Sequence, residues 1–366
     1  MKQFKLNYLF LALALATVFS SCRKDSNNRP DNQDIVPVRK GIFILNEGNI
    51  GFNNSSLIYY DYDTKVTVSD QFFTANSRGL GDTGNDVQVY GSKMYIVVNF
   101  SSTVEVTDTK TAKSIKRIEL KNGTSPRQPT YIVFNKNKAF ISSYDGTVAV
   151  MDTATLAVEK YITVGRNPER MAIANGKLYV ANSGGLAYPN YDKTISVIDL
   201  NTLTETKKIT VQVNPKGVYA DKYGDIYVSS PGNYDDIQPS LTIIDSKTDL
   251  VTKTIADFDA QIMTISGDYA FIAGTDYNAV TKESVAYVKL FNVKTETVDK
   301  ANFITDGTKI DAPYSITVDA VTGEVFVTDA KNYSTNGQVF CFSANGAKKY
   351  VLNTGLLPSK IVFINK

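Results

Sequence analysis

The sequence predicts an all-β fold, a seven-bladed β-propeller, and the first observation behind this prediction is a turn that recurs along the chain. An Asp-x-x-Thr turn, or a close variant of it, closes a short β-run at steps of 44 to 51 residues. A period of this length with about four strands per unit is typical of propeller blades. The copies begin at Asp61, Asp108, Asp152, Asp199, Asp245, Asn292 and Ser343.

The second observation is that each repeat follows one pattern of four strands. The second strand carries an aromatic residue among aliphatic ones, the third runs into the turn, and the fourth is amphipathic. Alternation of this kind buries one face of a strand and exposes the other. We expect the turn Asp to bond backbone N–H groups rather than a metal, and the aromatics to pack between blades. The aromatics are Phe43, Tyr95, Phe140, Tyr179, Tyr227, Phe271 and Phe326.

The third observation concerns the two ends of the repeat array. The first unit lacks its own first strand and begins directly at the second, residues 41–46. The missing strand matches the C-terminal stretch 358–364. We therefore expect the last strand to complete the first blade and close the ring.

The first 38 residues have the pattern of a targeting segment. Residues 1–21 combine basic residues, a short apolar run and small residues, which predicts a lipoprotein signal peptide rather than a membrane span. Cys22 follows directly and is the expected lipidation site. Residues 22–38 are polar and free of aromatics, so we expect a disordered tether ahead of a propeller over 39–366. A Lys-Asp pair after Cys22 resembles surface-export signals of Bacteroidetes lipoproteins, which favours the outer membrane, facing the cell exterior.

The amino-acid composition limits the classes of function that we expect for this protein. The 366 residues include no His and no Trp, and the formal net charge is +2. Absence of His removes the commonest general base, the Ser-His-Asp arrangement and His-ligated metals, so we do not expect an enzyme. No basic cluster points to a nucleic-acid partner. Cys341 has no disulfide partner once Cys22 is lipidated, and we expect it buried in a monomeric propeller.

Function is expected in the loops of one face, where second-to-third-strand loops meet the crossovers between blades. Most of these loops exceed the two to five residues that a hairpin needs, and Tyr, Asn, Asp and Gly dominate them. Such a face suits a large, nearly neutral, polar ligand; the alternative is that these residues are ordinary turn formers and surface Tyr. The candidate ligand-binding residues of these loops are Asn46, Asn49, Phe52, Asn99, Phe100, Tyr144, Asn182, Tyr188, Tyr191, Tyr234, Asp276, Tyr277 and Tyr333.

Three cationic residues of the crossover loops join this set. Arg127, Arg166 and Lys216 can each pair with a phosphate or carboxylate of a ligand, or equally with a protein neighbour such as Glu169. Two acidic turns, 81–86 and 235–236, place carboxylates close together as Ca²⁺ sites do. Neither has EF-hand spacing, so we expect no metal site and no cofactor, with a bound Ca²⁺ as the alternative.

A resemblance to known propellers rests on residues 165–183 and 195–199. They closely resemble the YVTN-type repeat of surface-layer-like proteins, with Tyr179-Val-Ala-Asn182 at the namesake tetrapeptide. The resemblance covers about 41–366 and implies the propeller fold, but not a function.

A narrower resemblance rests on the opening segment 41–49, on Asn182 and on the loop 329–333. These look like the BtuG-type cobalamin-capturing lipoproteins of Bacteroidetes, which pass the vitamin to an outer-membrane, TonB-dependent transporter of the BtuB type. The resemblance implies cobalamin as a ligand rather than a cofactor, bound through its periphery without a protein ligand to cobalt. Peripheral amides and one phosphodiester would match Asn, Tyr and Arg side chains.

Two other classes of function stay open. A surface adhesion or assembly propeller that binds glycan or protein partners would use the same Tyr-rich face. A lyase or quinone-dependent dehydrogenase is a third possibility, although lyase propellers usually rely on His and quinoprotein blades on Trp, and the chain contains neither residue.

Overall fold

The structure is a computed structural model that describes residues 37–278 and 282–366, without the side chains at 277, 278, 283 and 284. The predicted signal peptide, the lipidation site Cys22 and nearly all of the predicted tether lie outside this part. Residues from Val38 to Lys366 form one compact unit. Within the described residues, no helix has the length and apolarity needed to cross a membrane.

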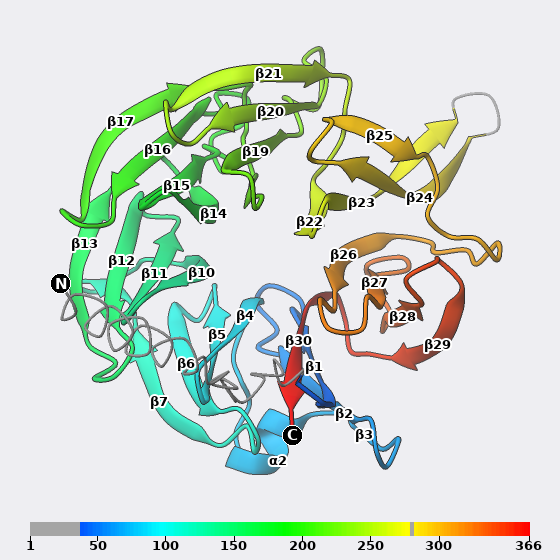
Figure 1. Ribbon diagram of the computed structural model, residues 1–366. Helices are drawn as coiled ribbons and strands as arrows, with labels where there is room; N and C mark the ends of the chain where they lie inside the picture. The colour runs from blue at the N-terminus through cyan, green and yellow to red at the C-terminus, as the bar shows by residue number, and fades with distance from the viewer. Residues whose placement is uncertain (1–36, 279–281) are drawn as a thin grey trace, which may run out of the picture. The chain divides into compact units, whose positions relative to one another are not determined.

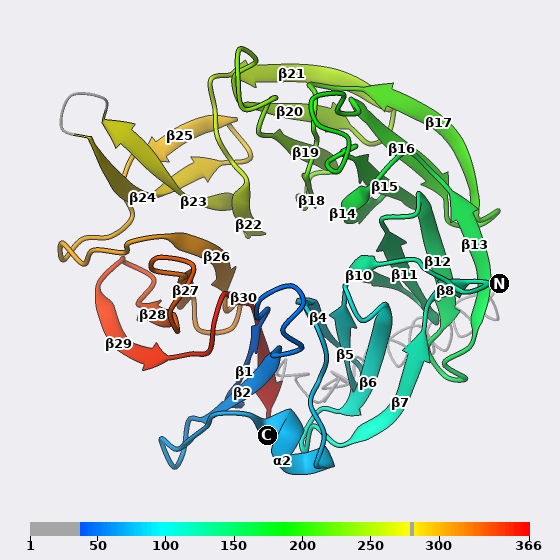
Figure 2. The ribbon, with the colours of Figure 1, turned by 180° about the vertical axis from the view of Figure 1, so that it is seen from behind.

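The described chain forms seven four-stranded antiparallel sheets arranged in a ring, which confirms the predicted fold class. Figures 1 and 2 show this ring from opposite sides. Each sheet is one blade, and its innermost strand faces the central axis. From the innermost strand outward, blade 1 consists of β30 (Pro358–Asn365), β1 (Arg39–Asn46), β2 (Ser56–Asp61) and β3 (Thr67–Val68), and blade 2 consists of β4 (Gly84–Tyr90), β5 (Lys93–Val98), β6 (Thr103–Asp108) and β7 (Ser114–Glu119). In the same order, blade 3 consists of β10 (Pro129–Asn135), β11 (Lys138–Ser143), β12 (Thr147–Asp152) and β13 (Val158–Thr163), blade 4 of β14 (Pro168–Ala174), β15 (Lys177–Asn182), β16 (Thr194–Asp199) and β17 (Thr204–Thr210), and blade 5 of β18 (Gly217–Ala220), β19 (Asp225–Ser230), β20 (Ser240–Asp245) and β21 (Leu250–Ala256). Blade 6 consists of β22 (Ile262–Ser266), β23 (Tyr269–Asn278), β24 (Glu283–Asn292) and β25 (Thr297–Lys300), and blade 7 of β26 (Pro313–Val318), β27 (Val325–Asp329), β28 (Gln338–Phe342) and β29 (Lys348–Asn353).

Two short elements decorate the connections between blades. The helix α2 (Gln71–Asn76) lies between blades 1 and 2, and its N-cap Asp70 accepts a hydrogen bond from the Phe73 backbone N–H. A small hairpin of β8 (Lys121–Asn122) and β9 (Ser125–Pro126) lies between blades 2 and 3.

The core lies between neighbouring blades, as the second-strand aromatics predicted. Six of the seven are at most 1% exposed, and Phe271 is partly buried against the same core. Tyr179 also joins two blades by hydrogen bonds, because its hydroxyl donates to the Asp249 carboxylate over 2.5 Å and to the Ser246 carbonyl over 3.1 Å.

The repeated Asp-x-x-Thr turns are structural, as predicted. At the first copy, the Asp61 carboxylate accepts the backbone N–H groups of Asp63 and Thr64, each over 2.9 Å. The same pair of bonds recurs at Asp108, Asp152, Asp199, Asp245 and Asn292. These donors hold the pKa of Asp61 well below its usual range, together with the nearby Lys40 ammonium.

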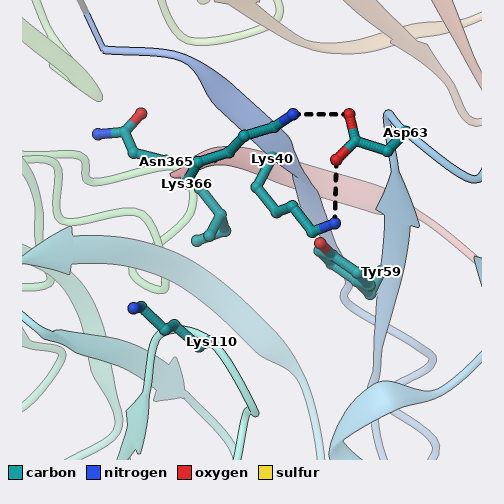
Figure 3. A pocket seen from close by; sticks show the side chains of 7 residues that line it. Lys40, Tyr59, Asp63, Lys110, Asn365 and Lys366 are labelled. Carbon is teal, nitrogen blue, oxygen red and sulfur yellow. Dashed lines mark hydrogen bonds and ion pairs between the residues drawn. The ribbon is translucent and has the colours of Figure 1, made fainter.

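The C-terminal strand closes the ring, which confirms the prediction from the chain ends. β30 pairs antiparallel with β1, so that Ile44 lies opposite Ile361. Charged contacts reinforce this closure on the face formed by the Asp-x-x-Thr turns. Lys366 and Lys40 both pair with Asp63, over 2.8 and 3.1 Å, beside a shallow pocket that also contains Tyr59 and Lys110 (Figure 3).

Candidate binding face

The second-to-third-strand loops and the blade crossovers meet on one face, as expected. We call this face, formed by residues 46–55, 99–102, 144–146, 183–193, 231–239 and 330–337 with the crossovers beside them, the loop face. Backbone hydrogen bonds join the two sets of loops, for example from Asn99 N to Thr83 O over 2.7 Å and from Tyr144 N to Gln128 O over 3.0 Å. In blade 7, Ala330 N donates to Ala312 O over 2.8 Å. The loops therefore have a fixed framework.

Blade 6 differs from the prediction. Residues 275–282 were expected as a loop, but β23 continues to Asn278 and β24 begins at Glu283, so the two form a long hairpin. Asp276 lies on this hairpin opposite Val285, and its exposed carboxylate lies 3.7 Å from the Lys289 ammonium. The Tyr277 side chain lies outside the described part of the structure.

Three of the predicted amide side chains are used inside the propeller. Asn46 and Asn182 are at most 1% exposed, and their carbonyl oxygens accept the backbone N–H groups of Gly355 and Gly165 over 3.0 and 2.9 Å. A Cβ at Gly165 would lie 2.4 Å from the Asn182 side chain, so this crossover needs glycine. Asn99 donates to the Pro129 carbonyl over 2.9 Å. These amides hold the loops in place and are not available to a ligand.

Two of the predicted cationic residues have protein partners. Arg127 is 9% exposed, pairs with Asp145, donates to the Lys121 carbonyl over 3.1 Å and stacks over the Tyr161 ring at 3.8 Å. Arg166 pairs with Asp192 and donates to the Asn190 carbonyl over 2.9 Å. The structure thus favours the protein neighbour for both residues.

Exposed aromatic side chains gather on the loop face. The most exposed is Phe52, at 72%, and the others are more than two-fifths exposed. The aliphatic Ile50 and Leu186 are also exposed on these loops, and their apolar exposure was not predicted from the sequence. Exposed apolar side chains on the loops of one face make that face a candidate interaction site. We call the following residues the aromatic rim: Phe52, Phe100, Tyr188, Tyr234 and Tyr333.

The rim is connected to polar groups beneath it. Tyr191 links Tyr188 to Tyr234 through edge-on ring contacts, at centroid distances of 6.0 and 6.3 Å. The Lys216 ammonium donates to the Tyr234 hydroxyl over 3.2 Å. On the other side of the ring, Tyr333 contacts Tyr314 edge-on at 6.2 Å.

The backbone of two rim tyrosines is strained. Tyr234 and Tyr333 both have a φ of 61°, a left-handed conformation that bulky residues seldom adopt. Each follows an asparagine whose side chain accepts a backbone N–H from the residue after the tyrosine. The candidate Asn49 is half-buried, and its backbone N–H donates to the Asn54 side chain over 2.9 Å.

Two carboxylate–tyrosine pairs lie where the loop face meets the central shaft. The Tyr314 hydroxyl donates to Glu47, and the Tyr144 hydroxyl donates to Glu169 over 3.2 Å. Burial raises the pKa of Glu47, and it raises the pKa of Glu169 to about 7 although the Lys216 charge and the Tyr144 bond oppose it. Neither pair was predicted, because their members are separated by 267 and 25 residues along the chain.

The raised pKa of Glu169 predicts a pH-dependent stability. Between the ordinary value of 4.5 and about 7, the native state keeps a proton that the unfolded chain has lost. The free energy of unfolding should therefore fall as the pH rises through this window, by roughly 2–3 kcal/mol. Urea unfolding at pH 5 and pH 8 measures the change, and Glu169→Gln should remove most of it. An unchanged pH dependence in that variant would contradict the assignment to Glu169.

The acidic turns do not form a metal cluster in the described residues. The Asp82 carboxylate accepts from Gly51 N and from the Thr83 hydroxyl, each over 2.9 Å, and Asp236 accepts from Asn233 over 2.6 Å. Across residues 37–278 and 282–366, no group of three or more Cys, Asp and Glu side chains is placed to hold an ion.

Cys341 is buried, as predicted, and burial raises its pKa to about 12.

The ring and its loop face define a seven-bladed β-propeller with a candidate binding face. More particularly, the chain belongs to the family described as "Domain of unknown function (DUF5074)", whose model matches residues 40–363. No curated protein sequence matches the chain.

Solved structures of other propellers are similar in fold. A quinoprotein alcohol dehydrogenase-like protein from Bacteroides thetaiotaomicron has 17% identity and a TM-score of 0.64, over 89% of this chain and 78% of that one. A protein of unknown function from Desulfotomaculum acetoxidans has 13% identity and a TM-score of 0.63, over 89% and 99%. Hydrazine synthase from Kuenenia stuttgartiensis has 15% identity and a TM-score of 0.62, over 75% and 93%. At these identities the likeness concerns the fold alone.

Proposed function

We propose that this protein is a lipid-anchored protein of the outer membrane that captures cobalamin on the loop face and passes it to a TonB-dependent transporter. The observation that carries the proposal is the aromatic rim. Its side chains are solvent-exposed and lie on the loops of five of the seven blades, blades 1, 2, 4, 5 and 7.

The chemistry of the rim suits a corrinoid. The flat macrocycle has apolar edges that can pack on Tyr and Phe rings, and its amide arms need hydrogen-bond partners such as tyrosine hydroxyls and loop backbone groups. Lys216 adds a positive charge beside Tyr234. Asn46, Asn99 and Asn182 have no part in this proposal, since their amides are already bonded within the fold. Anchoring through Cys22 rests on the signal pattern of residues 1–22, and handover to a transporter rests on the sequence resemblance.

Co-elution with cyanocobalamin tests the proposal directly. The lipid-free propeller, residues 38–366, would be mixed with the vitamin and separated on a sizing column, with absorbance of the corrin followed alongside that of the protein. We expect the red colour to elute with the protein. Colour confined to the small-molecule volume, with no heat of binding in calorimetry, would refute cobalamin capture.

A glycan or protein partner is the second candidate for the same face. The exposed aliphatic residues Ile50 and Leu186 favour it, because they extend the apolar surface beyond the tyrosines. If cobalamin does not bind, retention of the protein on polysaccharide columns through the rim tyrosines would support the glycan alternative.

A further inference from the structure

A small cavity lies in the central shaft, directly beneath the loop face. The crossovers of that face lead into the innermost strands, and the cavity is lined where β14, β22, β26 and β30 begin. Side chains of four blades therefore converge on it. Its volume is about 30 Å³, which exceeds the roughly 10–15 Å³ that one water molecule needs and limits any occupant to a few heavy atoms. The residues that matter here are Arg170, Lys360, Gln261, Tyr314 and Ser359.

Two cationic side chains face this cavity without a protein partner. Within the described chain, neither the Arg170 guanidinium nor the Lys360 ammonium has a hydrogen bond or an ion pair. The centre of the guanidinium lies 4.3 Å above the Tyr131 ring. A guanidinium stacked in this way keeps its in-plane N–H groups free for an acceptor. The hydroxyls of Tyr314 and Ser359 already donate, to Glu47 and to the Gly84 carbonyl.

The two acids whose charges act on Arg170, Asp86 and Glu169, are bonded to other groups. Asp86 is 2% exposed, and its carboxylate already accepts from Val87 N over 3.0 Å and Ile132 N over 3.1 Å. Burial lowers the pKa of Lys360, and the charge of Arg170 lowers it further, while Asp86 acts in the opposite direction. Glu169 is held by Tyr144, and its pKa of about 7 leaves it partly neutral. The carboxylates whose charges act on Arg170 and Lys360 are therefore already engaged by other hydrogen-bond donors.

We infer that this shaft cavity binds a small oxyanion, a phosphate, sulfate or carboxylate group held between Arg170 and Lys360. Partly buried cations are costly without a counter-charge, and guanidinium and ammonium groups form their strongest hydrogen bonds with anionic oxygen. The oxyanion is either a free anion or the anionic group of a ligand on the loop face. The inference holds whatever that ligand is.

Inorganic phosphate is the probe for the free anion. Thermal unfolding and calorimetry of residues 38–366 would be followed as phosphate replaces chloride at constant ionic strength. We expect a saturable rise in unfolding temperature, and at least about tenfold weaker phosphate binding in Lys360→Met, with Arg170→Gln as the second variant. Lys110→Met removes an equal charge from the exposed face shown in Figure 3 and should bind phosphate like the wild type.

The outcomes separate clearly. If phosphate stabilises the protein no more than chloride does, or if both shaft variants that fold bind it as the wild type does, the inference is overturned.

A competition experiment then identifies the source of the anion. Phosphate that weakens binding of cyanocobalamin, but not of a corrinoid without the phosphodiester, assigns the site to the ligand's own group; phosphate without effect on either assigns it to a free anion. Failure of all corrinoids to bind would refute the proposed function alone, because the phosphate titration stands by itself.

Discussion

Deleting residues 356–366, so that the chain ends at Gly355, is expected to abolish cooperative unfolding of the propeller. The deletion removes β30, the innermost strand of blade 1, and leaves the β1 edge unpaired. It also removes the buried side chains of Ile361, Val362 and Ile364 from two inter-blade cores. Burial of each side chain contributes about 1.5–3 kcal/mol. Together with the lost strand pairing, this loss is comparable to the whole stability of a typical domain, about 5–15 kcal/mol.

Thermal unfolding followed by circular dichroism measures this effect, and hydrogen exchange in β1 and β2 locates it. The matched control deletes only Lys366, which removes the ion pair with Asp63 and should cost less than about 1 kcal/mol because both groups are half-exposed. A truncated chain with a sharp transition at the wild-type temperature would show that β30 is dispensable for ring closure.

The regular part of the fold was predictable because it is encoded by local chemistry. A turn Asp that bonds the next backbone N–H groups leaves the same signature in every repeat, and so does an aromatic residue on a strand buried on one face. Ring closure was predictable for a related reason, since one repeat lacks a strand and the C-terminus supplies it. Blade 6 was mispredicted because its Asp, Asn and Thr residues resemble a loop, whereas cross-strand pairing extends both strands.

The sequence predicted which loops form the candidate binding face, but it predicted less well which side chains on those loops are exposed. Asn182 and Phe52 both belong to loops rich in turn formers, yet one is fully buried and the other largely exposed. Sequence alone does not give the direction of a loop side chain, and that direction decides whether an amide bonds a crossover or a ligand. The pairing of Tyr314 with Glu47 depends on the meeting of the first and last blades, so no local pattern reports it.

Replacing three rim tyrosines, Tyr188, Tyr234 and Tyr333, by alanine is expected to weaken cyanocobalamin binding by roughly 100-fold or more. Truncation of a well-placed interface aromatic commonly costs about 2 kcal/mol, and each 1.4 kcal/mol is about tenfold in affinity. We expect the three losses to be less than additive, since Tyr191 links Tyr188 and Tyr234. Calorimetric titration of the triple variant measures the change in affinity.

The same variant should unfold at nearly the wild-type temperature, because all three side chains are more than half exposed and contribute little to the core. Tyr223→Ala is the matched control, since this exposed tyrosine lies in the β18–β19 turn, away from the loop face, and its hydroxyl bonds Asp268. It should leave cobalamin affinity unchanged. If the triple variant instead loses stability in proportion to its loss of binding, the rim tyrosines pack the loops rather than meet a ligand, and the reason for assigning a ligand to this face disappears.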